Sequence, residues 1–292
     1  MSTVNHKANQ LWCMLLKNYE INWEIGDIIK VKLYKKGLDL KKLDLKEPLI
    51  IQGFSGIGNV GLIAVRHMLT EARARPLFEV MNLDMPSVAF VENGLFTDWS
   101  NIFSVMVYLW RRPKGRDVLF SCSYTQPLTP LGSNIIAHVL LRKLSDMGVE
   151  DLVSLGCFGT NNYVKNPKVY VSATSKKVLN EFESIPNVIA LRDGRISGLN
   201  GVMPLLASSY DMLGVSLLAE GLSRISFNPR SSKALIEVLN AHYDLNIDTG
   251  ALDVYSEKLE KEIEKLRMRL PTEPEGIIEP RAGQDQIDSY YT

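Results

Sequence analysis

The sequence predicts an α/β protein in which a mostly parallel sheet is covered by helices on both faces. Two observations support this fold class. Short apolar runs of strand length recur through the body of the chain, and segments with helical periodicity separate them. Strands at the centre of a parallel sheet are buried on both faces, so they read as continuous apolar runs.

The expected strands begin with residues 27–35, which alternate apolar and polar side chains as in a half-buried strand. The continuous apolar runs are residues 48–54, 87–92, 102–110, 117–123, 151–157, 168–174 and 214–220. Two helices are expected between them. Residues 58–74 and 134–147 each place apolar side chains on one face: Val60, Ile63, Ala64 and Met68 in the first, Ile135, Val139, Leu140 and Leu144 in the second.

Composition divides the chain into four zones. Residues 1–45 form an N-terminal extension with one strand, and residues 46–250 form the α/β body. Residues 251–270 read as a charged helix. Residues 271–292 contain several prolines and hold five acidic residues against one basic residue, with few apolar side chains. Such a segment cannot bury enough surface to offset its ordering entropy, so we expect a disordered tail.

Charge and cysteine usage exclude several classes of protein. The 33 basic and 33 acidic residues balance, so no overall charge favours nucleic acid or an anionic membrane as a partner. The apolar stretch at residues 11–16 is too short for a signal peptide core or a membrane span. Three widely spaced cysteines, Cys13, Cys122 and Cys157, form no CxxC pair, which is typical of a reducing compartment. We therefore expect a cytoplasmic protein.

The strongest local motif is the GxGxxG sequence at Gly56, Gly58 and Gly61, which follows an expected strand and opens an expected helix. Backbone N–H groups at such a helix N-terminus can hold a phosphate or another anion, here with Asn59 beside them. The alternative is that the glycines only permit a tight turn and close packing of the helix on the sheet.

Catalytic motifs are incomplete in the sequence. A dinucleotide site needs an acid at the end of the next strand, and neither Glu79 nor Asp84 is convincingly placed for it. A nucleophile elbow around Ser55 would need a glycine where Ile57 stands. No metal-ligand spacing is formed by the four histidines, His6, His67, His138 and His242. The spacing therefore places no acid/base pair and no catalytic triad, and we expect no metal and no cofactor.

Residues 251–270 carry a short heptad pattern in which apolar residues occupy a and d positions. These residues are Leu252, Leu259, Ile263, Leu266 and Leu270. Five acidic and five basic residues fill other positions. A lone helix of this length needs a partner for its apolar side. The pattern fits either a seam between subunits or a helix that packs on its own body.

Six segments of the body occur in an order that resembles the archaeal branch of the proteasome assembly chaperone 2 family. They are residues 53–61, 86–94, 126–132, 153–160, 167–174 and 194–201. The resemblance covers about residues 46–250. Two places depart from the family: Ser55-Gly56 stands where Pro-Gly is frequent, and residues 221–229 replace a loop rich in glycine and proline. The first affects a turn, and the second a subunit contact or a pocket rim.

The resemblance implies a three-layer α/β/α sandwich similar to purine nucleoside phosphorylases, and a non-enzymatic assembly chaperone or activator of the core proteasome. In this family context, the terminal Tyr290-Tyr291-Thr292 matches the hydrophobic–tyrosine–any residue (HbYX) motif of proteasome-docking proteins. We expect it to enter pockets between subunits of the outer (alpha) ring. Several weak anchors bind well only together, which predicts a homo-oligomer. The resemblance implies a tetramer or a pentamer.

Two other functions stay open on the sequence alone. The likeness to nucleoside phosphorylases allows a phosphorylase or hydrolase that binds phosphate or a nucleotide at residues 56–61. A scaffold would instead bind another partner through residues 251–270, and the terminal tyrosines would then be exposed at a frayed chain end.

Overall fold

A computed structural model of the chain describes residues 20–24, 29–35, 38–82, 84, 89, 91–96 and 104–269. The chain divides into two compact units, Met1–Ser256 and Glu257–Thr292. The strands are β1 (Glu20–Glu24), β2 (Ile29–Leu33), β3 (Leu49–Phe54), β4 (Arg75–Asn82), β5 (Val91–Glu92), β6 (Leu95–Phe96), β7 (Ser104–Trp110), β8 (Val118–Ser123), β9 (Asp151–Thr160), β10 (Val169–Ala173), β11 (Val188–Ala190) and β12 (Leu213–Leu222). The α-helices are α2 (Val60–Glu71), α4 (Pro130–Asp146), α5 (Lys176–Glu183), α6 (Leu199–Ala207), α7 (Pro229–Tyr243) and α8 (Gly250–Arg269), and the short 3-10 helices are η1 (Leu40–Lys42), η2 (Ile57–Asn59) and η3 (Ser208–Tyr210).

Ten strands of the described residues form one sheet, in the order β1-β2-β4-β7-β8-β3-β9-β12-β10-β11. The four central strands, β8, β3, β9 and β12, run parallel to one another. The flank from β8 to β1 pairs antiparallel throughout, and β10 is antiparallel to β12. The sheet is thus mixed, with its parallel part at the centre, and the predicted α/β fold is confirmed.

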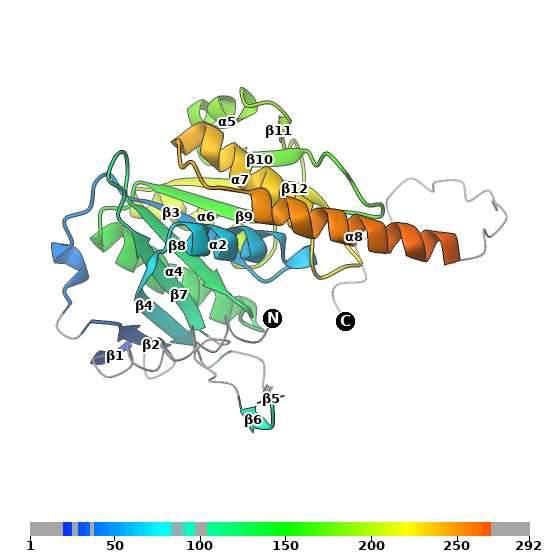
Figure 1. Cartoon of the computed structure of the whole chain (residues 1–292). Coiled ribbons are helices and arrows are strands. Elements are labelled where there is room, and N and C mark those ends of the chain that lie inside the picture. The colour runs from blue at the N-terminus through cyan, green and yellow to red at the C-terminus, as the bar shows by residue number, and fades with distance from the viewer. Residues whose placement is uncertain are drawn as a thin grey trace. The chain divides into compact units, whose positions relative to one another are not determined.

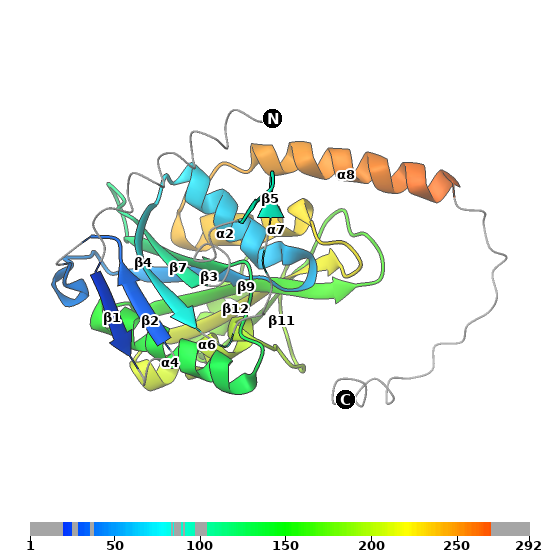
Figure 2. The ribbon, with the colours of Figure 1, turned by 90° about the horizontal axis from the view of Figure 1, so that it is seen from below.

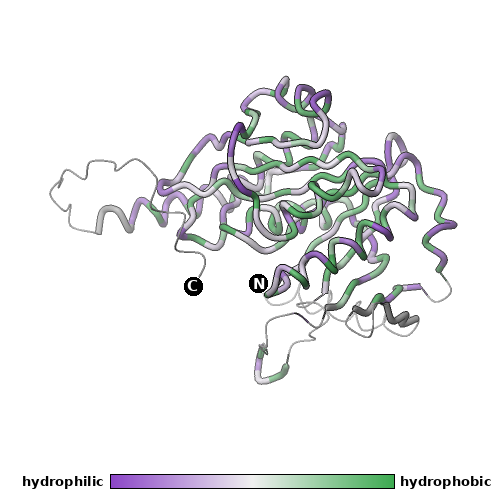
Figure 3. The backbone as a smooth tube through the Cα atoms, turned by 180° about the vertical axis from the view of Figure 1, so that it is seen from behind, coloured by the Kyte–Doolittle hydropathy of each residue, from purple (hydrophilic) through white to green (hydrophobic). Residues whose placement is uncertain are grey.

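Helices cover both faces of this sheet (Figures 1 and 2). Alternate side chains of β3 show how the two layers share the core. Leu49 and Ile51 pack with residues of α2, α5 and α7, whereas Ile50 and Phe54 pack with residues of α4 and α6. Hydrophobic residues, green in Figure 3, run along the central strands between these layers. The predicted three-layer arrangement is therefore present.

Most of the expected strands are found. The runs at residues 48–54, 117–123, 151–157 and 214–220 correspond to β3, β8, β9 and β12, and residues 102–110 and 168–174 contain β7 and β10. Residues 27–35 contain β2, which pairs with β4 and so belongs to the main sheet. The run at residues 87–92 falls mostly outside the described residues, which include β5 at its end.

The structure also contains elements that were not expected, among them α5, α6 and α7. Two of the departures have local causes. β4 was not predicted, because Pro76 and a buried acid, Glu79, interrupt its apolar pattern; its register with β7 shifts between Pro76 and Phe78. Helix α4 begins at Pro130, several residues earlier than expected. Proline suits the first helical turn, and the Thr129 hydroxyl accepts a hydrogen bond from the Gly132 N–H at 3.0 Å.

Among the described residues, no helix combines the length and hydropathy that a transmembrane span requires.

The buried face of α4 generates a test of the core. Leu140→Ala is expected to lower the free energy of unfolding by about 2–5 kcal/mol, because Leu140 is 0% exposed and its truncation leaves a cavity. Leu131→Ala in the same helix is the matched control, because Leu131 is 69% exposed. This substitution should change the free energy of unfolding by less than about 0.5 kcal/mol. Chemical denaturation at one protein concentration compares the two. Equal losses would contradict the assigned orientation of α4.

Candidate functional site

The glycine-rich loop joins β3 to α2 at the carboxyl end of the central strands. A Cβ atom built on Gly61 would lie 2.0 Å from the carbonyl oxygen of Leu155 in β9, and one built on Gly53 would lie 2.1 Å from the carbonyl oxygen of Gly61. Both positions therefore require glycine, because backbone meets backbone there. Gly56 differs, since its nearest neighbour would lie 3.9 Å from such a Cβ atom.

The loop after β12 packs against this glycine-rich loop. Gly58 and Asn59 have positive φ angles of 61° and 50°. A Cβ atom on Gly58 would lie 2.1 Å from the side-chain nitrogen of Asn228. The Asn228 side chain also accepts a hydrogen bond from the Leu222 N–H at 3.1 Å, and Asn59 Nδ2 donates to the Ser226 carbonyl at 3.1 Å. These contacts give Gly58 and Asn59 a structural role.

Gln126 connects three of the segments that resemble the family. Its Nε2 donates to the carbonyl oxygen of Ser55, and its Oε1 accepts from the Leu199 N–H at 2.8 Å. A Cβ atom on Gly198, whose φ is 68°, would lie 2.4 Å from Gln126 Oε1. The glycine therefore leaves room for the amide. One side chain thus holds together the loops that follow β3, β8 and β11.

A buried row of polar side chains ties α6 to the central strands. Gln52 Nε2 donates to Ser154 Oγ at 3.1 Å, and the Phe54 N–H donates to Asn200 Oδ1 at 3.3 Å. Ser216 Oγ donates to the Asn200 carbonyl at 3.3 Å. These groups are at most 8% exposed. Buried polar groups need such partners, so the row fixes the position of α6. Among the described residues, none donates a hydrogen bond to Gln52 Oε1.

The sheet order does not match a dinucleotide-binding unit. The strand after α2 is β4, which β7 and β8 separate from β3, whereas the fingerprint requires an adjacent parallel strand. Glu79 is buried in β4, forms an ion pair with Lys32 at 3.3 Å and accepts from the Tyr34 hydroxyl at 2.9 Å. Asp84 accepts from the N–H and hydroxyl of Thr129 at 2.9 and 2.8 Å, at the start of α4. Both acids are engaged in structural contacts.

The described histidines and cysteines also have structural surroundings. His67 contacts the Asp248 carbonyl at 2.6 Å, and His138 contacts the Tyr210 hydroxyl at 2.7 Å. His242 stacks on Phe182 with ring centroids 4.0 Å apart, and burial lowers its pKa. Burial raises the pKa of two thiols to about 12, which keeps them protonated at neutral pH; these are Cys122 and Cys157. In the described part of the chain, no cluster of three or more acids, histidines or cysteines could hold a metal ion.

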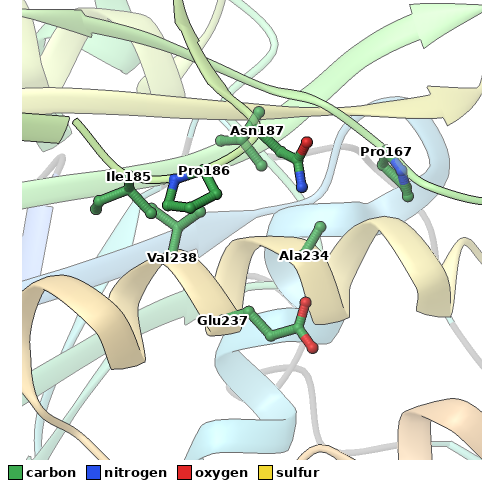
Figure 4. Close-up of a pocket in the computed structure, with 8 residues that line it drawn as sticks. Pro167, Ile185, Pro186, Asn187, Ala234, Glu237 and Val238 are labelled. Carbon is green, nitrogen blue, oxygen red and sulfur yellow. The ribbon is translucent and has the colours of Figure 1, made fainter. Parts of the chain in front are cut away.

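A small cleft of about 220 Å³ lies between α7 and the β10–β11 edge of the sheet (Figure 4). Most of its lining residues are apolar, and its polar side chains are Asn187 and Glu237. Glu237 forms an ion pair with Lys233, in which Oε1 and Nζ are 3.5 Å apart. The lining residues are Pro167, Val169, Ile185, Pro186, Asn187, Ala234, Glu237 and Val238. The glycine-rich loop contributes none of them, so the cleft and the predicted anion site are separate places.

The predicted oligomer seam divides between the two units. Leu252 is 3% exposed and packs in the core cluster that contains α2 and α7 residues, so its side chain is occupied within its own subunit. Leu259 and Ile263 lie on α8 in the second unit, where they are partly exposed. The side chain of Leu266 lies outside the described residues. Leu270 and the predicted docking residues Tyr290, Tyr291 and Thr292 lie wholly outside them.

Comparison with known proteins identifies relatives over most of the chain. A family model described as the PAC2 family matches residues 50–267. An uncharacterized protein of Methanocaldococcus jannaschii is 26% identical over 223 residues, which are 76% of this chain and 84% of that protein. A second one from the same organism is 24% identical over 234 residues, with 79% and 90% covered.

Solved structures share the fold. Pyrococcus furiosus PbaB, described as an archaeal proteasome activator, superposes with a TM-score of 0.72 at 22% identity, covering 82% of this chain and 98% of its own. PbaA of the same organism, described as an archaeal homolog of proteasome-assembly chaperone, superposes with a TM-score of 0.64 at 21% identity. The match covers 86% of this chain and 92% of PbaA. A Mycobacterium tuberculosis proteasome-assembly chaperone homologue superposes with a TM-score of 0.62 at 19% identity. The match covers 76% of this chain and 97% of that protein.

Two glycines of the same loop form a matched pair for a test of its role. Gly61→Ala is expected to lower the free energy of unfolding by about 1–3 kcal/mol, because its methyl group would meet the Leu155 carbonyl. Gly56→Ala should change it by less than about 0.5 kcal/mol, because Gly56 is extended and has open space. Urea denaturation measures both. If Gly56→Ala were the more destabilising, the packing explanation would be wrong.

Proposed function

The chain belongs to the PAC2 family, and we propose that it is a non-enzymatic homo-oligomer that binds the core proteasome as an assembly chaperone or activator. The descriptions of PbaB and PbaA, two structures with the same fold, support the choice of partner. The terminal sequence Tyr290-Tyr291-Thr292 is the observation that carries the proposed mode of binding.

The chemistry of the terminal residues suits a pocket between two partner subunits. The free terminal carboxylate can pair with a lysine, and a charge-assisted hydrogen bond is about twice as strong as a neutral one. The ring of Tyr291 can fill an apolar slot while its hydroxyl finds a partner at the slot's end. Tyr290 adds apolar contact area beside it. Three residues of this kind make a weak anchor on their own.

Several copies of the anchor on one particle would bind together. Once one tail is seated, the others are held near their pockets at a high effective concentration, which can raise the overall affinity by about 10²–10⁴-fold. A random chain with the length of residues 271–292 spans about 25 Å. The 20-residue α8 corresponds to about 30 Å of helix. These lengths suit tails that reach separate pockets of one ring.

We propose that α8 joins copies of the chain through the apolar residues that follow the body. Leu252 is buried within its own subunit. The remaining apolar residues of the heptad pattern would therefore form the intersubunit seam; they are Leu259, Ile263, Leu266 and Leu270. Helix α8 is fixed at its start, because Asp253 accepts from Lys233 Nζ at 2.7 Å and from Arg230 at 3.1 Å. These contacts lie within the first unit and hold the first turn of α8 against α7.

The docking tail is tested by moving its carboxylate. Addition of one glycine after Thr292 should weaken binding to purified core proteasome by about 10²-fold or more, because the anchor's charge is displaced. Thr292→Ser is the matched control and should bind like the unmodified chain, since the last side chain is free in the motif. Surface plasmon resonance with immobilised core particle measures both. Undiminished binding of the glycine-extended chain would refute tail docking.

The seam is tested by placing charges on its apolar side. Leu259→Asp with Ile263→Asp should lower the mass of the particle in native mass spectrometry, because two carboxylates would enter the seam. Lys261→Glu, at an exposed position of the same helix, is the control and should leave the mass unchanged. An unaltered mass with a lower unfolding midpoint would instead show that the helix packs on its own subunit.

A further inference from the structure

The sequence contains two Asn-Gly pairs, Asn93-Gly94 and Asn200-Gly201. An asparagine followed by glycine is prone to lose its side-chain amide, because glycine has no Cβ atom that would shield its backbone nitrogen. The two pairs share the same local chemistry, so a difference in their reactivity must come from the structure around them. The structure places the two pairs in opposite surroundings.

The pair at Asn200 is held by the core of the protein. Asn200 lies in the first turn of α6 and is 8% exposed. Its side-chain oxygen accepts hydrogen bonds from the Phe54 N–H at 3.3 Å and from Ser154 Oγ at 3.4 Å. The Gly201 N–H donates to the Gly198 carbonyl at 3.0 Å. The amide group and the glycine nitrogen of this pair are therefore both fixed by hydrogen bonds.

The pair at Asn93 forms the turn of the hairpin between β5 and β6. Asn93 and Gly94 are both exposed, and a Cβ atom built on Gly94 would meet nothing within 4 Å. Their φ angles are 53° and 80°, the positive values of an Asn-Gly hairpin turn. The paired residues of the hairpin flank these two positions, which leaves the Gly94 N–H outside the ladder.

This hairpin opens at a low cost in free energy. Among the described residues, β5 and β6 pair only with each other, and a two-stranded hairpin is marginally stable in water. Its apolar side chains add little, because Val91, Leu95 and Phe96 are 61%, 74% and 80% exposed. Local opening therefore lets Asn93 reach backbone conformations that differ from the turn.

We propose that Asn93 is a site of spontaneous deamidation in the folded protein and that Asn200 is protected from it. The Gly94 nitrogen attacks Asn93 Cγ and loses its proton to the solvent. The bond between Cγ and the side-chain nitrogen breaks, and this nitrogen leaves as ammonia. Water then opens the resulting succinimide ring at either of its carbonyl groups. One route gives aspartate, the other gives isoaspartate, and no atom is oxidised or reduced.

The reaction changes both the charge and the backbone of the hairpin. It adds a carboxylate next to Glu92, in a chain whose formal net charge at pH 7 is +0. Isoaspartate also carries the main chain through its side-chain carbon atoms, which lengthens a turn whose length sets the register of the hairpin. The modified chain is therefore more acidic and its hairpin is weaker. This inference is independent of the proposed binding to the core proteasome.

Prolonged incubation of the full chain at mildly alkaline pH tests the proposal, because base removes the proton of the attacking nitrogen. Peptide mapping by mass spectrometry should find aspartate and isoaspartate at position 93. Conversion of Asn200 should be at least about 10²-fold slower, because reaction there requires opening of the core. Anion-exchange chromatography should resolve an acidic form of the intact chain, for which the Asn93→Asp variant serves as the standard.

Two comparisons separate the effect of structure from that of sequence. In denaturant both pairs should react at similar rates, because neither is then held. Gly94→Asn should keep the turn, since asparagine tolerates positive φ, and should slow the reaction because its side chain shields the backbone nitrogen.

Three results would overturn the proposal. The first is equal conversion of Asn93 and Asn200 in the folded chain, which would mean that the fold does not decide. The second is conversion of Asn93 in the denatured chain only, which would mean that the hairpin protects it. The third is an unchanged rate in Gly94→Asn, which would exclude attack by the Gly94 nitrogen.

Discussion

The contact between the backbones of α2 and the central strands is the constraint on which much of the molecule depends. At Gly61 no side chain separates the backbone of α2 from the Leu155 carbonyl of β9. Beside Gly61, the Val60 carbonyl of α2 accepts a hydrogen bond from the Ser232 hydroxyl of α7 at 2.9 Å. Helix α7 in turn holds the start of α8 through Lys233 and Asp253. A single line of contacts therefore leads from the sheet to the helix that precedes the proposed docking tail.

The central part of the fold could be predicted because it is encoded locally. Strands buried on both faces, such as β3 and β9, read as apolar runs regardless of their partners. The antiparallel flank could not be predicted in the same way, because the direction and order of pairing depend on long-range contacts. β4 illustrates this. A buried acid such as Glu79 is unusual in a central strand, and its partners come from another segment: it forms an ion pair with Lys32 of β2 and accepts a hydrogen bond from the Tyr34 hydroxyl.

The glycine-rich loop shows where sequence reasoning about sites reaches its limit. Its spacing is compatible with anion binding and with close packing, and only the structure shows that Leu155 and Asn228 occupy the space beside Gly61 and Gly58. The role of Gln126 had no signal in the sequence, since its partners are backbone groups of two distant loops. Asn200 is similar, because its side-chain oxygen accepts hydrogen bonds from the Phe54 N–H of β3 and from Ser154 Oγ of β9. The terminal motif is a different case, because Tyr290, Tyr291 and Thr292 lie outside the described residues and their docking role rests on the sequence and the family context alone.

The order of the strands also affects how the chain is made. β9 lies between β3 and β12, so the middle of the sheet is complete only when residues from 49 to 222 have left the ribosome. At ordinary translation speeds the interval between β3 and β12 lasts roughly 10–30 s. All six residues of β3 are buried in the folded protein. During that interval the apolar β3 segment is exposed to solvent and prone to aggregate. A protein proposed to assist the assembly of others is therefore expected to depend on nascent-chain chaperones itself.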